Sequence, residues 1–156
     1  MSPAEQTAFK SLNREGPFMN LTSLITDNIS EILIKIIEFT QARQKILAQN
    51  IINLNMPGFV PKELGVDEFS NLLNHAIDEH IRTQRLVFYD TENIKFGPCG
   101  NLEVKPYADE TSKTLLDENQ CEYIEHQINK LWENSLNQKF AAELLRQNQE
   151  ALSSYY

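Results

Sequence analysis

The sequence predicts a mostly all-α protein in which two long terminal helices pack as a coiled-coil-like hairpin, with a short helix and a loop or small β element between them. Apolar residues recur at helical spacing in both end segments, glycine is scarce, and turn-forming residues gather in the middle. The chain therefore divides into four predicted segments. They are a flexible leader over 1–20, an N-terminal helix over 21–55, a middle segment over 56–115 and a C-terminal helix over 116–156.

The first long helix is predicted from an apolar stripe that starts at Leu21 and repeats every three or four residues. Its members are Leu21, Ile25, Ile29, Ile32, Leu33, Ile36, Ile37, Phe39, Ile46, Leu47, Ile51 and Leu54. The helix is expected to end near Asn55, because Pro57 disfavours a helical backbone at Met56. Residues 1–20 show no sustained period, which predicts the flexible leader.

The middle segment contains one strongly patterned helix, which Asp67 is expected to cap. One face of this helix carries Phe69, Leu72, Leu73, Ala76, Ile77, His80 and Ile81. Short apolar stretches over 86–89, 94–96 and 102–104 follow, separated by turn residues. These stretches fit either a small hairpin or an ordered loop.

The C-terminal segment has neither glycine nor proline from Asp117 to Leu152 and is predicted to be one long helix. Positions spaced alternately by four and three form a coiled-coil seam. The seam holds Ile124, Ile128, Leu131, Ala142, Leu145 and Leu152, interrupted by Ser135, Gln138 and Gln149. A second apolar stripe consists of Trp132, Leu136, Phe140 and Leu144. One stripe is expected to pack on the first helix and the other on neighbouring subunits; the alternative is one wide face buried within a monomer.

Composition argues against several classes of function. The net charge of −8 and the lack of a basic cluster argue against nucleic-acid binding. No apolar run approaches the roughly 20 residues of a membrane span, and the first residues lack the apolar region of a secretory signal. We therefore expect neither nucleic acid nor membrane insertion.

Catalytic and metal-binding patterns are not found in the sequence, so we expect no enzyme, no cofactor and no metal. His75 and His80 are five residues apart and diverge around a helix instead of sharing a face. Cys99 and Cys121 fit neither a disulfide scaffold nor a metal motif, and both are expected to be free thiols.

Two patches carry a resemblance to a known family. The first patch, over Gln41–Phe59, contains an alanine, then an asparagine pair framing apolar residues (Asn50 and Asn53), and an exit of proline, glycine and an aromatic residue. The second patch, over Ile128–Leu136, contains Lys-Leu before Glu-Asn and continues into Phe140 and a leucine pair. Together they resemble the flagellar basal-body rod protein family, and the second patch resembles its proximal-rod members.

The resemblance implies a structural subunit of the proximal rod, oligomeric in the assembled rod and located in the periplasmic part of the basal body. It implies other rod proteins, basal-body ring proteins and export-gate proteins as partners, and export without a cleaved signal peptide. The residues expected to form assembly contacts are Asn50, Asn53, Pro57, Gly58, Leu131, Asn134, Leu136 and Leu145. The competing hypothesis is a cytoplasmic helical adaptor or export chaperone.

Two pairs of these residues have a physical basis for the expected role. The amides of Asn50 and Asn53 lie three positions apart on one helix face, where they either bond across a subunit boundary or face solvent. Leu131 and Leu145 lie two heptads apart in the predicted seam. An Asp at Leu145 is therefore expected to leave the monomer soluble and to block assembly.

Overall fold

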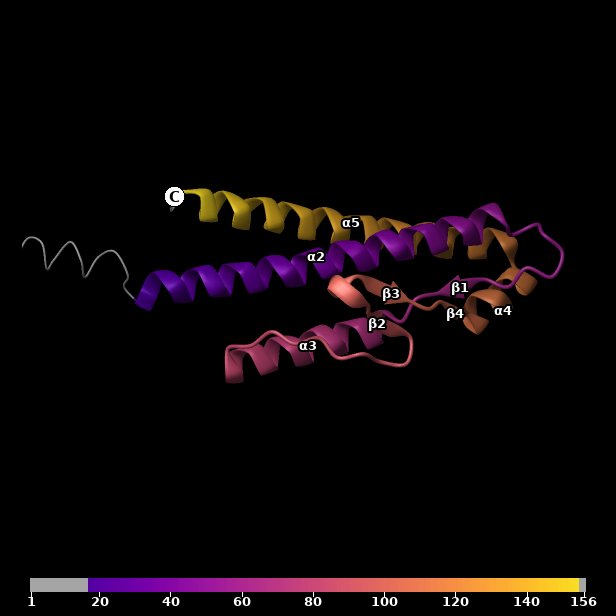
Figure 1. Ribbon diagram of the computed structural model, residues 1–156. Coiled ribbons are helices and arrows are strands. Elements are labelled where there is room, and N and C mark those ends of the chain that lie inside the picture. The colour runs from indigo at the N-terminus through magenta and orange to yellow at the C-terminus, as the bar shows by residue number, and fades with distance from the viewer. Residues whose placement is uncertain (1–16, 155–156) are drawn as a thin grey trace, which may run out of the picture.

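The computed structural model describes residues 17–154, with side-chain positions from residue 27 onward, and this part of the chain is mostly helical with a few short strands (Figure 1). In chain order the elements are α2 (Pro17–Ile52), β1 (Lys62–Glu63), α3 (Val66–Thr83), β2 (Ile94–Phe96), the 3-10 turn η1 (Pro98–Gly100), β3 (Leu102–Val104), β4 (Tyr107–Ala108), α4 (Glu110–Glu118) and α5 (Gln120–Ser153). The prediction of a mostly helical fold with a long helix near each end is confirmed.

Helix α2 begins earlier and ends earlier than the sequence predicts. It starts at Pro17, a residue tolerated in the first helical turn because its missing N–H has no helical partner there. Residues 17–20 therefore belong to the helix, while the rest of the predicted leader, 1–16, lies outside the described residues. The helix ends at Ile52, and the chain then turns through Gly58, whose φ of 73° is a conformation that favours glycine.

The predicted long C-terminal helix is present as α5, but it begins at Gln120 instead of Asp117, after a break at Asn119 that separates it from the unpredicted short helix α4. The backbone of Asn119 is extended, with φ −151° and ψ 100°, and its side chain accepts hydrogen bonds from the N–H groups of Cys121 and Glu122. Asn119 is thus the N-cap of α5, a role that asparagine fills well. In the same way Asp109 caps α4 by accepting a bond from the N–H of Ser112. A capped break between two helices leaves the polar sequence pattern intact, so hydrophobic periodicity does not reveal it.

The middle segment holds the predicted short helix and also short strands. Helix α3 follows Gly65, which makes no side-chain cap, so the predicted cap at Asp67 is wrong; Asp67 lies in the first turn, where its charge favours the helix dipole. The apolar face is buried over its first turns but ends in Ile81, which is 69% exposed. Strands β2 and β3 pair antiparallel, so the choice left open by the sequence resolves as a hairpin over 94–104. Strands β1 and β4 form a second antiparallel pair.

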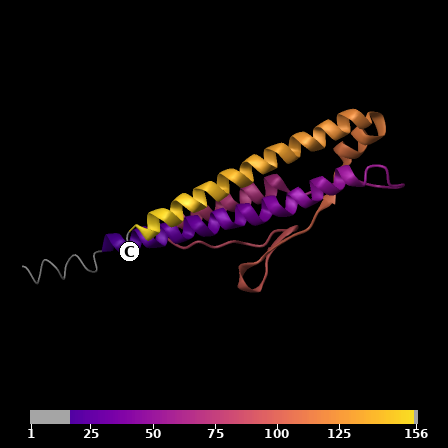
Figure 2. The same cartoon turned by 90° about the horizontal axis from the view of Figure 1, so that it is seen from above.

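Helices α2 and α5 lie side by side and run in opposite directions along most of their length (Figures 1 and 2). In the first half of α2, the hydroxyl of Ser30 accepts a hydrogen bond from the amide of Asn148 at 2.7 Å. Near its end, the amide of Asn50 donates to the side chain of Gln127 at 3.0 Å. Helix α3 and the two small sheets lie along the flank of α2.

The apolar core lies between α2, α3 and the β2–β3 hairpin. The rings of Phe39 and Phe69 stack at its centre, with centroids 4.1 Å apart. Its buried members are Phe39, Leu64, Phe69, Leu72, Leu73 and Ile94. Helix α5 contributes no residue to this buried cluster. The core therefore attaches α3 and the hairpin to α2, and α5 is held by other contacts.

Buried polar groups form direct hydrogen bonds between α2 and α5. Asn134 donates to the carbonyl of Thr40 at 2.8 Å, and the hydroxyl of Tyr123 donates to the carbonyl of Asn50 at 2.7 Å. Throughout the described residues, every buried side-chain nitrogen and oxygen has a hydrogen-bond partner. A satisfied polar network rigidifies a contact and fixes its register, because any slip leaves buried groups unpaired.

Asn50 is the centre of this network, and we predict that Asn50→Ala lowers the free energy of unfolding by roughly 2–3 kcal/mol. Its amide also donates to the carbonyl of Lys62 and accepts from the N–H of Lys62, so alanine leaves several buried groups unpaired. Urea denaturation of the purified protein measures the effect. Asn53→Ala is the matched control, expected within about 0.5 kcal/mol of wild type. Equal losses for the two variants would contradict this role of Asn50.

Candidate assembly surface

Two of the three asparagines predicted to contact other subunits, Asn50 and Asn134, lie inside the fold. They are 2% and 1% exposed, and their amides bond within the chain. Their predicted part in assembly stays a prediction, but their positions give both a role in joining α2 to α5. Asn53 is partly exposed beyond the last turn of α2.

The predicted seam of α5 coincides only in part with the buried side: its members Ile124, Leu131, Leu145 and Leu152 are half-buried, but the fully buried positions lie beside it. The buried residues are Tyr123, Gln127, Asn134 and Ala141, whereas Ile128, a predicted seam member, is 51% exposed. Polar side chains occupy the inner face at Gln127 and Asn134, so a search for apolar periodicity shifts the seam onto neighbouring positions. A buried polar residue gives no apolar signal, and this explains the error.

Of the three predicted leucines, only Leu136 lies openly on the surface. It is 51% exposed, while Leu131 and Leu145 are half-buried. At about 100° per residue, Leu145 lies within about 20° of Asn134 and so shares the side of α5 that faces α2. A charge at Leu145 therefore acts on the fold of the monomer before it acts on assembly.

An apolar stripe on the opposite side of α5 is not covered by any described element. We call it the outer stripe; its members are Ile128, Trp132, Leu136, Phe140 and Leu144. Trp132 and Phe140 are each 68% exposed. Each step of four residues advances about 40° around the helix, so the stripe winds from one flank of α5 across its outer side to the other flank. Contiguous exposed apolar surface of this kind marks an interaction site.

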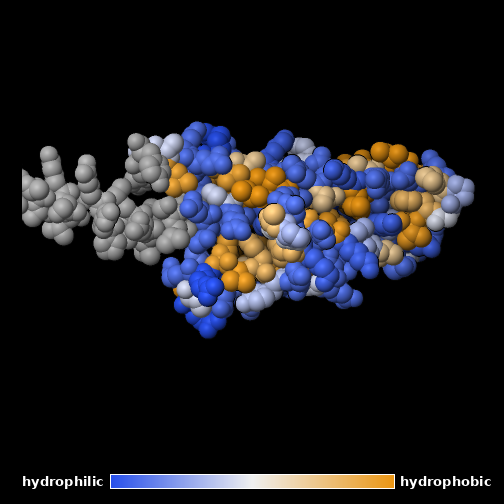
Figure 3. Space-filling model, viewed as in Figure 1, coloured by the Kyte–Doolittle hydropathy of each residue, from blue (hydrophilic) through white to orange (hydrophobic). Residues whose placement is uncertain are grey.

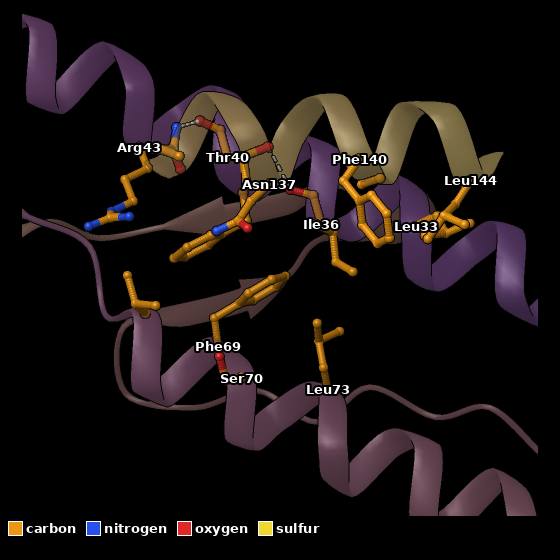
Figure 4. A pocket seen from close by; sticks show the side chains of 14 residues that line it. Leu33, Ile36, Thr40, Arg43, Phe69, Ser70, Leu73, Asn137, Phe140 and Leu144 are labelled. Atoms are coloured by element: carbon orange, nitrogen blue, oxygen red, sulfur yellow. Dashed lines mark hydrogen bonds between the residues drawn. The ribbon is translucent and has the colours of Figure 1, made fainter. Parts of the chain in front are cut away.

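The outer stripe ends at an apolar groove, which is lined by α2, α3 and α5 (Figure 4). The groove has a volume of about 340 Å³. Leu33 and Ile36 lie on its α2 side, Phe69 and Leu73 on its α3 side, and Phe140 and Leu144 on its α5 side. The space-filling view shows apolar surface gathered between α3 and the two long helices (Figure 3). We call this feature the three-helix groove.

The residues of the first family-like patch gather at the far end of α2. Asn53, Pro57 and Gly58 line a cleft of about 400 Å³ together with Met56. Met56 is 59% exposed and nearby Ile52 is 77% exposed. The structure thus brings three of the predicted assembly residues together at the tip of the molecule, at a distance from the predicted positions on α5 (Figure 1).

A buried ion cluster joins the elements that meet near this tip. Arg43 of α2 pairs with Glu63 of β1 at 3.0 Å, and Lys130 of α5 bridges Glu63 at 3.0 Å and Asp109 at 2.9 Å. The hydroxyl of Ser112 completes the cluster by donating to Asp109 at 2.6 Å. No local sequence pattern indicates this cluster, because its charged members lie far apart in the chain. Each charge faces a partner, which suits a structural role.

The pKa values of the ion cluster reflect competition between burial and pairing. Burial alone raises the pKa of Glu63, but the hydrogen bond and charge of Arg43 outweigh it and hold that pKa below its ordinary value. Burial likewise opposes the bonds from Ser112 and Lys130, which lower the pKa of Asp109. For Lys130, burial lowers the pKa, and the pairing with Asp109 and Glu63 raises it above the ordinary value. Neighbouring Tyr123 has its pKa raised to about 12, chiefly by burial.

The described residues offer no arrangement typical of a metal site. Within 17–154, no group of three or more His, Cys, Asp or Glu side chains is placed to hold an ion. Cys99 and Cys121 are both exposed and unbonded to each other. None of the described helices has the length and apolar character needed to cross a lipid bilayer.

No protein-family model, no curated protein and no solved structure matches this chain.

The ion cluster makes the free energy of unfolding decrease as the pH falls into the acid range. Because the folded-state pKa values of Glu63 and Asp109 lie below their ordinary 4.5 and 3.8, the unfolded chain binds protons first as the pH falls. We predict that the free energy of unfolding is constant near neutral pH, declines as the pH falls below about 5, and continues to decline through the folded pKa values. Chemical denaturation across the pH range measures this.

Glu63→Gln is the test variant for that prediction. It should lower stability at neutral pH by roughly 3 kcal/mol, because Arg43 loses its charged partner in a buried site. It should also flatten the acid decline, since one of the two titrating carboxylates is gone. A variant that keeps the wild-type acid slope would show that the cluster does not control acid stability.

The inner and outer sides of α5 are distinguished by a pair of substitutions. We predict that Leu145→Asp lowers the free energy of unfolding by roughly 3 kcal/mol, because it places a charge in the contact with α2. Leu136→Asp should change it by less than about 0.5 kcal/mol, because its side chain is open to solvent. Thermal or urea denaturation of dilute protein compares them. A larger loss of stability for Leu136→Asp than for Leu145→Asp would show that the side of α5 carrying Leu136, and not the side carrying Leu145, faces α2.

Proposed function

We propose that this chain is a structural subunit of the bacterial flagellar basal body, in the proximal rod, comparable to the rod protein FlgB. The observation that carries the proposal is the uncovered outer stripe on one of the two long helices. A monomer gains nothing from keeping two large rings, those of Trp132 and Phe140, in water, whereas a subunit buries them on assembly. The resemblance of the Gln41–Phe59 and Ile128–Leu136 patches to rod proteins supports the same reading.

In this proposal α2 and α5 form a coiled-coil-like hairpin that packs with its neighbours as the inner layer of the rod. The middle segment then forms the outer element, held to α2 by the core around Phe39 and Phe69. The partners are other rod proteins and the ring and export-gate proteins of the basal body. Export without a cleaved signal peptide delivers the chain to the periplasm.

The buried charged groups of the ion cluster are all paired with one another, and this supports a structural role in place of a catalytic one. A general acid or base or a nucleophile needs a reactive group open to a substrate. The buried carboxylates Glu63 and Asp109 are instead occupied by Arg43, Lys130 and Ser112. The proposal therefore includes no enzymatic activity and no cofactor.

The second candidate function is a cytoplasmic helical adaptor or export chaperone, which the three-helix groove favours. An open apolar groove between helices is a surface that binds the apolar face of a partner helix. The outer stripe favours the rod, because a chaperone that stays monomeric has no use for a second large apolar surface on the same helix.

Basal bodies isolated from the source cells test the proposal. We predict that the chain co-purifies with rings and rod after detergent extraction, and that deleting its gene gives non-motile cells with rings but no rod. Immunoblotting and electron microscopy measure these outcomes. A chain that remains in the cytoplasm, with basal bodies of normal structure in the deletion strain, would support the adaptor and overturn the rod assignment.

A further inference from the structure

One residue, Asn119, separates helix α4 from helix α5. Its backbone already makes the hydrogen bonds of a continuous helix, because its N–H donates to the carbonyl of Leu115 at 2.8 Å and its carbonyl accepts from the N–H of Tyr123 at 3.0 Å. The extended dihedral angles of Asn119, φ −151° and ψ 100°, are what bend the chain between the two helices. Asn119 is therefore a hinge of one residue.

Straightening this hinge costs no backbone hydrogen bond. In the bent form, the side chain of Asn119 accepts from the N–H groups of Cys121 and Glu122. In a straight helix, the same N–H groups bond to the carbonyls four residues earlier. The sequence permits a straight helix as well, since neither glycine nor proline occurs over residues 107–156. One helix from Glu110 to Ser153 is thus compatible with the local sequence.

A straight hinge separates contacts that the bent hinge brings together within one chain. Gln127 donates to the hydroxyl of Ser112 at 3.0 Å, and both side chains are fully buried. On one straight helix, these two residues lie about 22 Å apart, because each residue rises about 1.5 Å. Lys130 and Asp109, which pair at 2.9 Å, separate in the same way. Since buried groups without partners are costly, a straight chain needs a second copy to supply them.

We propose that two copies of this chain exchange α5: the hinge at Asn119 straightens, and α5 of each copy packs on α2 of the other. Such domain swapping reuses the contacts of the monomer and needs no additional complementary surface. The contacts that pass to the second copy are the bonds of Gln127 with Asn50, of Asn134 with the carbonyl of Thr40 and of Asn148 with Ser30. The inference goes beyond the proposed function, and it holds for a rod subunit and for an adaptor alike.

Charge opposes the approach of two copies but favours the exchanged contact. The net charge of −8 causes repulsion at long range. Within the exchanged contact, however, Lys130 of one copy meets Glu63 and Asp109 of the other, which are its partners in the monomer. Salt screens the long-range repulsion far more than these partly buried pairs. High salt therefore favours the swapped dimer.

Disulfide crosslinking between two single-cysteine forms of the full chain tests the exchange. Both forms carry Cys99→Ser and Cys121→Ser, which remove the exposed native thiols. One form adds Ser30→Cys and the other adds Asn148→Cys, at side chains that lie 2.7 Å apart in the monomer. The forms are mixed at increasing concentration in high salt, unfolded and refolded together, and then oxidised. We expect a mixed 30–148 dimer whose yield rises with concentration, because exchange alone brings these positions of two copies together.

Two controls distinguish exchange from other association. In the first, Glu133→Cys replaces Asn148→Cys at an exposed position about 22 Å away along α5, and it should give little mixed dimer. In the second, one chain carries both Ser30→Cys and Asn148→Cys and is oxidised while dilute. The internal disulfide ties α5 to its own α2, so this chain should remain monomeric at every concentration.

Substitutions at Asn119 test the hinge itself. Asn119→Ala removes the cap and favours a helical backbone, so it should raise the association constant of the dimer at least about tenfold. Asn119→Gly is the matched control, because glycine retains most of the capping preference and disfavours a helix interior. Its association constant should not exceed that of the wild type. Size-exclusion chromatography with light scattering measures all three proteins.

Any one of four results would overturn the proposal. They are no mixed 30–148 dimer at any concentration with the wild-type hinge, equal yields at positions 148 and 133, dimerisation of the internally crosslinked chain, or equal association constants for Asn119→Ala and Asn119→Gly. The crosslinking experiment uses the wild-type hinge, so it decides the question even where a hinge variant fails to fold. The presence of the chain in basal bodies is measured separately and does not bear on the exchange.

Discussion

The arrangement of this protein depends on the buried polar contact between α2 and α5. Asn50, Gln127 and Asn134 face inward, and the bonds from Asn50 to Gln127 and from Asn134 to the carbonyl of Thr40 form only when the two helices are in one register. A one-residue rotation of α5 would bury Ile128 but would leave these amides unpaired, at a cost of about 1–3 kcal/mol for each buried group. The polar contact thus decides which side of α5 faces α2, and the apolar outer stripe follows from that choice.

Near the tip of the molecule, the ion cluster likewise positions short elements against the two long helices through buried polar contacts. Glu63 and Asp109 sit on short elements that have little apolar surface of their own, and Arg43 and Lys130 tie them to the two long helices. Two-residue strands such as β1 and β4 are not stable alone. Their place is set by charge pairing and by the bond between the N–H of Asp109 and the carbonyl of Pro61. The apolar core and the ion cluster adjoin at β1, where Glu63 belongs to the cluster and Leu64 belongs to the core.

The sequence predicted the elements better than their contacts. Both long helices and α3 were predicted from the spacing of apolar residues, because that signal reports burial directly. The break at Asn119 was missed, since a polar cap in a polar stretch changes no apolar spacing. The predicted seam of α5 is shifted from the buried side at Gln127 and Asn134, because these buried residues are polar and give no apolar signal. Among the predicted assembly residues, Asn53, Pro57 and Gly58 do come together at the tip, and Leu136 does lie on the open side of α5. The ion pairs of the cluster join residues 20 to 67 positions apart, which no local pattern contains.

In the isolated chain, α5 keeps its polar side toward α2 and its apolar stripe toward solvent. Trp132 is the one tryptophan of the chain and belongs to the stripe, so its fluorescence reports on this side of the helix alone. Acrylamide is a neutral quencher and is suited to an acidic protein. In dilute protein under native conditions, we predict red-shifted emission that acrylamide quenches nearly as well as it quenches a free tryptophan analogue. Blue-shifted emission protected from acrylamide in the dilute monomer would mean that the stripe is buried within the chain, which contradicts the account.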